Sequence, residues 1–316
     1  MAATSVIAYD RRIRLNRLSI CNRKFGNLVI EMGDRLAQQL PNHQITQLPN
    51  SSASPRLRGE IISYYRALLT RYGAQNWWPA QSRFEVIVGA YLTQNTNWTN
   101  VEKAMANLRR ARALSLNAMR KMPLERIEEL IRPSGYFRQK AKKLKTFIAF
   151  LDARYSGSLD RMFSQETEQL RAELLELNGV GPETADSILL YAGNHPVFVV
   201  DAYTRRILER HGLIPAKAGY EEIRQLIENA FSKAEAVALL VEKPGADPRH
   251  AVSRMSRASR TALAQHYNEF HALIVRVGNQ LCRATPDCAG CPLKNYLPAS
   301  AGATAQNAPE SYRTRN

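Results

Sequence analysis

The sequence predicts an all-α fold, and three observations support this class. Apolar residues recur at a spacing near 3.6 through most of the chain, whereas no segment alternates apolar and polar residues as a half-buried strand does. Turn signals rich in glycine and proline separate the apolar segments. The 316 residues are 45% hydrophobic and 23% charged, which is a globular composition that excludes wholesale disorder.

Helical spacing is found in ten successive segments, and each is long enough to bury one apolar face. These are residues 61–72, 84–92, 101–108, 127–131, 141–151, 168–177, 184–191, 204–210, 220–231 and 262–282. The clearest turns between them lie at residues 133–135, 179–182 and 193–196. Residues 235–259 contain two prolines and lack this spacing, so we expect an irregular insertion there.

The two ends of the chain differ in composition from its middle. Residues 1–55 are rich in arginine and poor in acids, and we interpret them as a flexible basic extension. The sequence leaves three alternatives open for this segment: it is an organellar transit peptide, it is an arm that tracks DNA, or the true protein starts at Met32. Residues 299–316 are small and polar, which predicts a loose tail.

The net charge of +16 indicates an acidic partner, and nucleic acid is the most common one for so basic a chain. No apolar run approaches the roughly 18 residues that cross a bilayer, so we expect no membrane partner. Basic side chains follow the turn at 133–135, and we expect some of them to track a DNA backbone. They are Arg138, Lys140, Lys142, Lys143 and Lys145.

The most informative segment joins two predicted helices at residues 177–186. Gly179 and Gly181 flank Val180, and glycine permits both a positive φ and a close backbone approach. Pro182 suits the first position of the next helix, where Thr184 follows. Such a turn can present backbone amides to a phosphate, although the same pattern also makes an ordinary helix–helix turn.

A second motif follows some twenty residues later, at residues 199–206, and contains Asp201. Together the two motifs resemble the helix-hairpin-helix and Gly/Pro-rich loop with catalytic aspartate of the endonuclease III superfamily of DNA glycosylases. The resemblance implies that Asp201 is the catalytic carboxylate and that Gly179, Val180, Gly181 and Thr184 contact the DNA backbone. A fixed carboxylate stabilises the positive charge that develops on the sugar, and it can orient or deprotonate water. Asp201 is also well placed to cap the helix that follows it.

Glu183 stands where bifunctional members of that superfamily carry a lysine. A carboxylate cannot form a Schiff base with the sugar, so the substitution predicts hydrolysis by water without lyase activity. Glu183 itself is interpreted as a first-turn acid that interacts with the helix dipole.

The tryptophans indicate which base is removed. Residues 94–98, 76–79 and 132–137 together resemble the 3-methyladenine glycosylase branch, in which two aromatic side chains sandwich the flipped base. The resemblance places Trp98 with Trp78 or Trp77 in the base pocket and Gln94 in the hole left by the flipped nucleotide. Aromatic faces attract cations, and 3-methyladenine in DNA carries a positive charge. A pocket lysine of that branch is replaced by Leu273.

Three of the four cysteines lie near the C-terminus and resemble the iron–sulfur loop of the superfamily. Five residues separate Cys282 from Cys288 and two separate Cys288 from Cys291, but the fourth cysteine position holds Leu297. A [4Fe–4S] cluster normally needs four thiolates. A degenerate loop without metal, a three-cysteine cluster with a foreign ligand, and completion by another group remain open, and we favour the first.

These observations predict a two-lobed, all-α DNA glycosylase over residues 56–298. The resemblance implies a middle lobe at about 84–195, a second lobe from 56–83 and 196–298, and a DNA-binding cleft between them. We expect a monofunctional, monomeric enzyme that acts on double-stranded DNA containing an alkylated purine such as 3-methyladenine, without a required cofactor and in a bacterial cytoplasm. The alternatives are a glycosylase for an oxidised or deaminated pyrimidine, and a non-catalytic helix-hairpin-helix DNA-binding protein.

Overall fold

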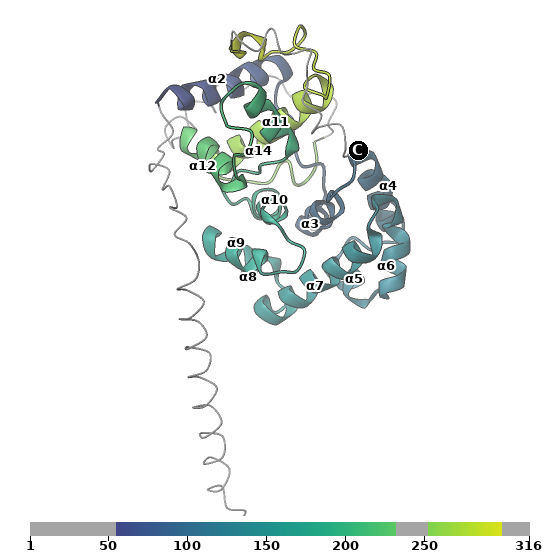
Figure 1. Ribbon diagram of the computed structural model, residues 1–316. Helices are drawn as coiled ribbons and strands as arrows, with labels where there is room; N and C mark the ends of the chain where they lie inside the picture. The colour runs from purple at the N-terminus through teal and green to yellow at the C-terminus, as the bar shows by residue number, and fades with distance from the viewer. Residues whose placement is uncertain (1–54, 232–251, 299–316) are drawn as a thin grey trace, which may run out of the picture. The chain divides into compact units, whose positions relative to one another are not determined.

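The computed structural model describes residues 55–231 and 252–298, and these residues form helices and turns without a strand among them (Figure 1). The predicted all-α class is therefore confirmed. The expected basic extension, the C-terminal tail, Cys21 and most of the insertion at 235–259 lie outside the described residues. Across the described ranges, no helix is both long enough and apolar enough to span a membrane.

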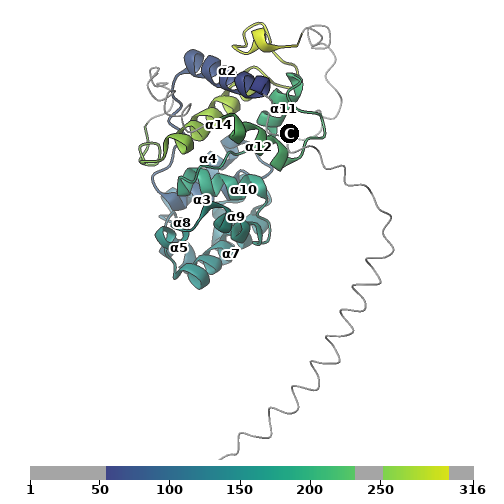
Figure 2. The ribbon, with the colours of Figure 1, turned by 90° about the vertical axis from the view of Figure 1, so that its left-hand side faces the viewer.

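One lobe contains helices from both ends of the described chain. Here α2 (Pro55–Tyr72) packs against α12 (Tyr220–Ala230) and α14 (Ala262–Gln280), and α11 (Ala202–Arg210) packs along α14. A short 3₁₀ turn, η3 (Lys294–Tyr296), follows in the C-terminal loop. Figures 1 and 2 show α2, α11, α12 and α14 grouped together.

The other lobe is continuous in sequence and begins at α3 (Arg83–Leu92). It contains α3, α4, η1 and α5 to α10, and α10 is continued by one π-helical turn, η2. Their bounds are α4 (Trp98–Arg110), α5 (Leu116–Lys121), α6 (Leu124–Leu130), η1 (Arg132–Ser134), α7 (Phe137–Tyr155), α8 (Leu159–Phe163), α9 (Thr167–Leu175), α10 (Pro182–Ser187) and η2 (Ile188–Gly193).

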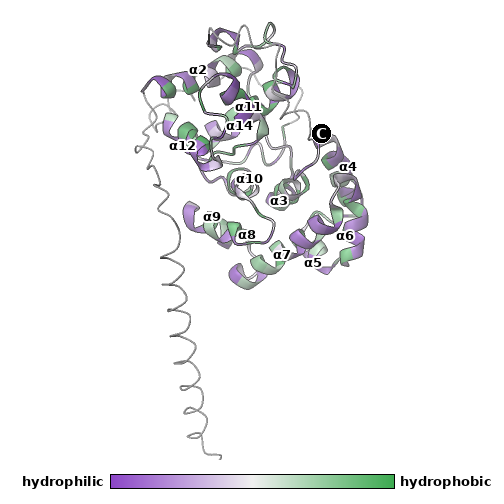
Figure 3. Cartoon of the chain, in the orientation of Figure 1, coloured by the Kyte–Doolittle hydropathy of each residue, from purple (hydrophilic) through white to green (hydrophobic). Residues whose placement is uncertain are grey.

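The π-helical turn η2 joins the two lobes, because it packs against α3 on one side and α14 on the other. Its residues 188–192 are all buried, and so are nine of the ten residues of α3. One continuous hydrophobic core runs through both lobes. In Figure 3 the helices show hydrophobic and hydrophilic residues side by side, as expected of helices that bury one face.

Side-chain caps explain where several helices begin. Ser82, Asn97, Asp201 and Thr261 each accept a hydrogen bond from a backbone amide three residues later. Such a cap satisfies one of the amides that the first turn of a helix leaves without an intrahelical partner. The helix that follows Asp201 is therefore fixed in register at the residue of greatest functional interest.

The basic run after residue 135 is wholly helical, but part of it does not face solvent. Lys140 is buried, with Nζ donating to the carbonyls of Leu92 (2.9 Å) and Ser134 (2.7 Å). Burial lowers the pKa of this amine to about 8, and the charge of Lys143 adds to the effect. Lys140 is therefore not one of the basic side chains that can track DNA, because its amine binds carbonyls at the C-terminal end of α3 and in η1.

Candidate active site

Asp201 lies at the point where an extended segment enters α11. Its Oδ1 accepts hydrogen bonds from the backbone amide of Thr204 (2.7 Å) and from the hydroxyl of Thr204 (2.9 Å), so the capping role is realised. Its side chain is 13% exposed. Burial raises the carboxyl pKa, but interactions with His271 and the hydrogen bonds from Thr204 outweigh that effect, and the net pKa is lowered. Asp201 is therefore an ionised, nearly buried carboxylate at neutral pH.

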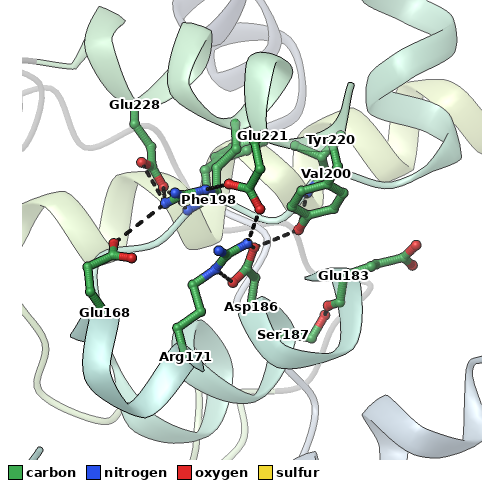
Figure 4. A network of polar contacts seen from close by, with 11 residues as sticks. Glu168, Arg171, Glu183, Asp186, Ser187, Phe198, Val200, Tyr220, Glu221 and Glu228 are labelled. Atoms are coloured by element: carbon green, nitrogen blue, oxygen red, sulfur yellow. Dashed lines mark hydrogen bonds and ion pairs between the residues drawn. The ribbon is translucent and has the colours of Figure 1, made fainter. Parts of the chain in front are cut away.

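Glu183 faces the same region from the first turn of α10. It is exposed, and Figure 4 shows its side chain pointing away from the neighbouring polar contacts. Desolvation raises the pKa of Glu183 to about 7, the charge of Asp201 raises it further, and the charge of His271 lowers it. The pKa of Glu183 is therefore raised while that of Asp201 is lowered, and such a division separates the roles of paired acids in enzyme sites.

The turn between α9 and α10 has the geometry expected of a hairpin. Gly179 has a φ of +81°, and a Cβ at this position would lie 2.1 Å from Cε of Lys143. A Cβ at Gly181 would meet nothing within 4 Å, so this side of the turn is open. Val180 is buried beneath the turn, and its amide donates to the carbonyl of Leu177 (2.9 Å). The hairpin thus presents open backbone on one side.

Gln94 lies on this hairpin. Its Nε2 donates to the carbonyl of Gly179 (3.0 Å) and to Oγ1 of Thr184 (2.9 Å), and its Oε1 accepts from Nζ of Lys143 (2.7 Å). The loop after α3, the hairpin and α7 are therefore joined through one amide. This position lies beside the expected DNA-contacting turn.

The three tryptophans predicted for the base pocket form one cluster. Ring centroids are 5.2 Å apart for Trp77 and Trp78, 5.4 Å for Trp77 and Trp98, and 5.4 Å for Trp78 and Trp98. The ring planes are tilted by 46° to 73°, so the rings touch one another and leave no parallel slot. Trp98 is half-buried at the start of α4, whereas Trp78 is buried.

Segments distant in sequence hold the loop that carries Trp77 and Trp78. The carboxylate of Glu269 accepts from the backbone amide of Gln75 (2.7 Å), and the hydroxyl of Ser253 donates to the carbonyl of Trp78 (3.0 Å). Ser253 belongs to the predicted irregular insertion, so the described end of that segment supports the loop.

Two residues that sequence analysis did not nominate complete the site. His271 on α14 places Nε2 3.6 Å from Oδ2 of Asp201, and its Nδ1 is hydrogen-bonded to the hydroxyl of Tyr191. The ring of Tyr191 packs against Trp78, with centroids 5.1 Å apart. The aromatic cluster and Asp201 are therefore joined by a path of contacts. The sequence did contain one signal for His271, because Glu269 and His271 are polar residues within the apolar pattern of α14, where both are buried.

A buried polar network fixes the hairpin relative to the segment that leads to Asp201 (Figure 4). Arg171 on α9 donates to both carboxylate oxygens of Asp186 on α10, at 2.7 and 3.2 Å. Tyr220 on α12 donates to Asp186 (2.8 Å) and accepts from the backbone amide of Val200 (3.2 Å). The network thus reaches the residue directly before Asp201.

Cys282, Cys288 and Cys291 are free thiols that line a small cavity with Leu297 and Arg210. The guanidinium of Arg210 donates to Sγ of Cys282 (3.2 Å), and Leu297, which holds the fourth cysteine position in the sequence, lines the same cavity. Within residues 55–231 and 252–298, no group of three or more His, Cys, Asp or Glu side chains is arranged to hold a metal ion. The side chains of this loop therefore do not fit a four-thiolate cluster.

Residues 88–233 match the family model of the HhH-GPD superfamily of base excision DNA repair proteins. A candidate DNA repair glycosylase of Methanocaldococcus jannaschii is 41% identical over 238 residues, which cover 75% of this chain and 94% of the relative.

Two solved structures are similar to this chain. The H. pylori 3-methyladenine DNA glycosylase MagIII bound to 1,N6-ethenoadenine is 30% identical, with a TM-score of 0.57, and the match covers 71% of this chain and 97% of that one. A non-covalent endonuclease III–DNA complex has a TM-score of 0.59 at 18% identity, covering 79% of this chain and 99% of that one. The second match bears on the fold alone.

Proposed function

The chain belongs to the HhH-GPD superfamily of base excision DNA repair proteins as a DNA glycosylase, and we propose that it is monofunctional and releases an alkylated purine. The observation that carries the monofunctional proposal is Glu183, a carboxylate at the position where bifunctional members carry the lyase amine. The alkylated-purine proposal is supported by the half-buried Trp98, whose ring is more accessible than that of Trp78, and by the similarity to the MagIII structure.

The two carboxylates suit hydrolysis with water as the nucleophile. As the bond between the base and C1′ breaks, its electron pair leaves with the base, and a cationic 3-methyladenine departs neutral. The ionised Asp201 stabilises the positive charge that remains on the sugar. Water then bonds to C1′ and gives a proton to Glu183, whose pKa of about 7 suits a general base at neutral pH. The products are an abasic site and a free base.

Base release from double-stranded DNA containing 3-methyladenine tests this proposal, with strand integrity read before and after alkali. We expect free base and strands that break only after alkali, because Glu183 stands at the position of the amine that forms the Schiff base in bifunctional members. Strand breaks without alkali, or a borohydride-trapped protein–DNA adduct, would contradict the monofunctional proposal. Release of uracil or an oxidised pyrimidine in place of 3-methyladenine would contradict the substrate proposal, and DNA binding without any release would favour a non-catalytic binder.

Glu183 predicts a pH dependence of base release. A general base acts in its ionised form, so the single-turnover rate should rise as pH increases through about 7. Glu183→Gln should lose this rise, and its rate at pH 8 should be about tenfold lower than that of the intact protein. This factor is smaller than general bases usually contribute, because the bond to an alkylated base is already labile. Rates corrected for enzyme-free release between pH 5.5 and 8.5 measure this effect. An unchanged profile in the variant would restrict Glu183 to interaction with the helix dipole.

Trp98 predicts a preference for cationic bases. Trp98→Ala should reduce kcat/KM for 3-methyladenine by about tenfold, because a cation on an indole face gains roughly 0.5–2 kcal/mol. The same variant should affect a neutral lesion such as uracil far less. Trp98→Phe is the matched control, since it keeps an aromatic face. Because Trp98 is half-buried, its substitution should cost little stability. Trp78 is buried, so its substitution would destabilise the fold and obscure any effect on base recognition. Equal losses on both lesions would contradict recognition of charge.

We further propose that the reaction requires no cofactor, since each step above uses a carboxylate and water. Purified protein without iron and sulfide should release base at the full rate. A rate that follows the iron content would contradict this proposal.

A further inference from the structure

We propose that His271 is the positioning residue of Asp201, and that Tyr191 fixes the tautomer in which His271 acts. The inference rests on the proposed function of Asp201 and assigns a role to two residues that the hydrolysis described above does not use. The Tyr191 hydroxyl is hydrogen-bonded to Nδ1 of His271, and Nε2 on the other side of the same ring faces Asp201.

The tautomer follows from the hydrogen bonds of Tyr191. Its side chain is 1% exposed, and burial raises the pKa of the phenol well above its usual value, so the hydroxyl keeps its proton. Among the described residues the hydroxyl has one polar partner, Nδ1 of His271. A buried hydroxyl needs an acceptor for its hydrogen, so we infer that Nδ1 of His271 is the acceptor and that the ring carries its hydrogen on Nε2.

Nε2 of His271 is buried and has no hydrogen-bond partner within the described part of the chain. It faces Oδ2 of Asp201 across 3.6 Å, which is too long for a direct hydrogen bond. Oδ1 of the same carboxylate is already held by two hydrogen bonds from Thr204. A buried nitrogen without a hydrogen-bond partner thus faces a carboxylate oxygen.

Catalytic hydrogen bonds are often long in the ligand-free enzyme and shorten when substrate is bound. We infer that His271 donates Nε2–H to Oδ2 when DNA occupies the site, while Thr204 holds Oδ1. The carboxylate is then fixed from two sides and cannot rotate away from the sugar. His271 interacts electrostatically with both Asp201 and Glu183, and a hydrogen bond to Oδ2 would orient the carboxylate of Asp201 directly.

A glycine explains how the two helices bring these groups together. A Cβ at Gly278, seven residues after His271 on α14, would lie 2.6 Å from Cδ1 of Tyr203, two residues after Asp201. Arg206 also donates to the carbonyl of Gly278 (2.9 Å). The close packing of α11 on α14 therefore sets the distance between Asp201 and His271.

The chain contains a matched control on the same helix. His266 of α14 is also buried, and its Nδ1 is hydrogen-bonded to the Tyr65 hydroxyl (2.8 Å). Removing either histidine breaks a buried histidine–tyrosine pair, but His271 is the member of the two that faces a catalytic carboxylate. A purely structural role predicts the same result for both substitutions.

The test measures single-turnover base release and affinity for lesion-free DNA. His271→Leu should lower the rate by about thirtyfold with affinity changed less than twofold, whereas His266→Leu should keep the rate within about threefold at a similar loss of Tm. His271→Gln, which retains an N–H donor, should recover most of the rate, and Tyr191→Phe should lose part of it. His271→Leu added to Asp201→Asn should cost nothing further. Equal effects of the two histidine substitutions, or additive loss in the double variant, would overturn the proposal.

A measurement that does not need the substrate separates this proposal from the proposed function. Nitrogen-15 NMR of labelled histidine reports which ring nitrogen carries the hydrogen. We expect His271 to be in the Nε2–H tautomer in the intact protein. In Tyr191→Phe we expect a mixture of the two tautomers, because the hydrogen bond to Nδ1 is lost. An Nδ1–H tautomer in the intact protein would overturn the proposal, whereas absence of base release from every lesion, with the Nε2–H tautomer present, would overturn the proposed function alone.

Discussion

Asp201→Asn is expected to lower the single-turnover rate of base release by about 10²- to 10³-fold, because the amide cannot stabilise the positive charge on the sugar. The protein should remain folded and bind DNA as before. Asparagine is as good a helix cap as aspartate, and its amide oxygen can still accept the hydrogen bonds that Thr204 gives to Oδ1. The rate on 3-methyladenine DNA, the Tm and the affinity for lesion-free DNA together measure this outcome.

Asp201→Ala provides the comparison that separates charge from capping. It removes both functions and should cost about 1 kcal/mol of stability in addition to the lost rate. If Asp201→Asn kept the full rate while Asp201→Ala lost stability, Asp201 would be a helix cap and the catalytic assignment would fail.

Arg171→Leu is expected to lower the free energy of unfolding by about 3–5 kcal/mol, because it leaves a buried carboxylate without its cation. Asp186 is fully buried, and Arg171 is 9% exposed. Burial raises the pKa of Asp186, and the hydrogen bonds from Arg171 act against that rise, so removal of Arg171 strands the charge. Urea unfolding at pH 7 measures the loss.

The exposed pair of Arg120 and Asp152 is the matched control. It also forms two charge-assisted hydrogen bonds, at 2.8 and 2.6 Å, but both side chains are more than a third exposed. Arg120→Leu should therefore cost less than about 1 kcal/mol. Equal costs for the two substitutions would show that the buried network carries no special share of the stability.

The sequence predicted the long helices well and the short ones poorly. Each of the ten segments predicted from apolar spacing lies on a helix. The helix α2 begins earlier than its apolar pattern, because its first turn is polar. The helices α5 and α8 have six and five residues, too few to show a period. Residues 188–193 were predicted as ordinary helix, and the π-helical turn there has no spacing signal of its own.

The candidate site could be predicted only where it is local in sequence. The hairpin and Asp201 lie within one stretch of chain, and both were identified from it. Tyr191 and His271 are 80 positions apart, and Arg171 meets Asp186 and Glu221 through tertiary packing, so no spacing rule joins them. The run of lysines shows the reverse failure, since charge alone did not reveal that Lys140 is buried and bound to carbonyls.

The helix α14 supports two different parts of the site, and this limits which sequence changes the helix can accept during evolution. Glu269 holds the loop of Trp77 and Trp78, and His271 faces Asp201 only two residues further along the same helix. One inserted residue between them would turn everything after it by about 100° around the helix axis. Substitutions in this stretch can be selected one at a time, but an insertion or deletion would separate the aromatic cluster from the carboxylate in a single step. We therefore expect functional relatives to differ here in residue type and to keep the length of the helix.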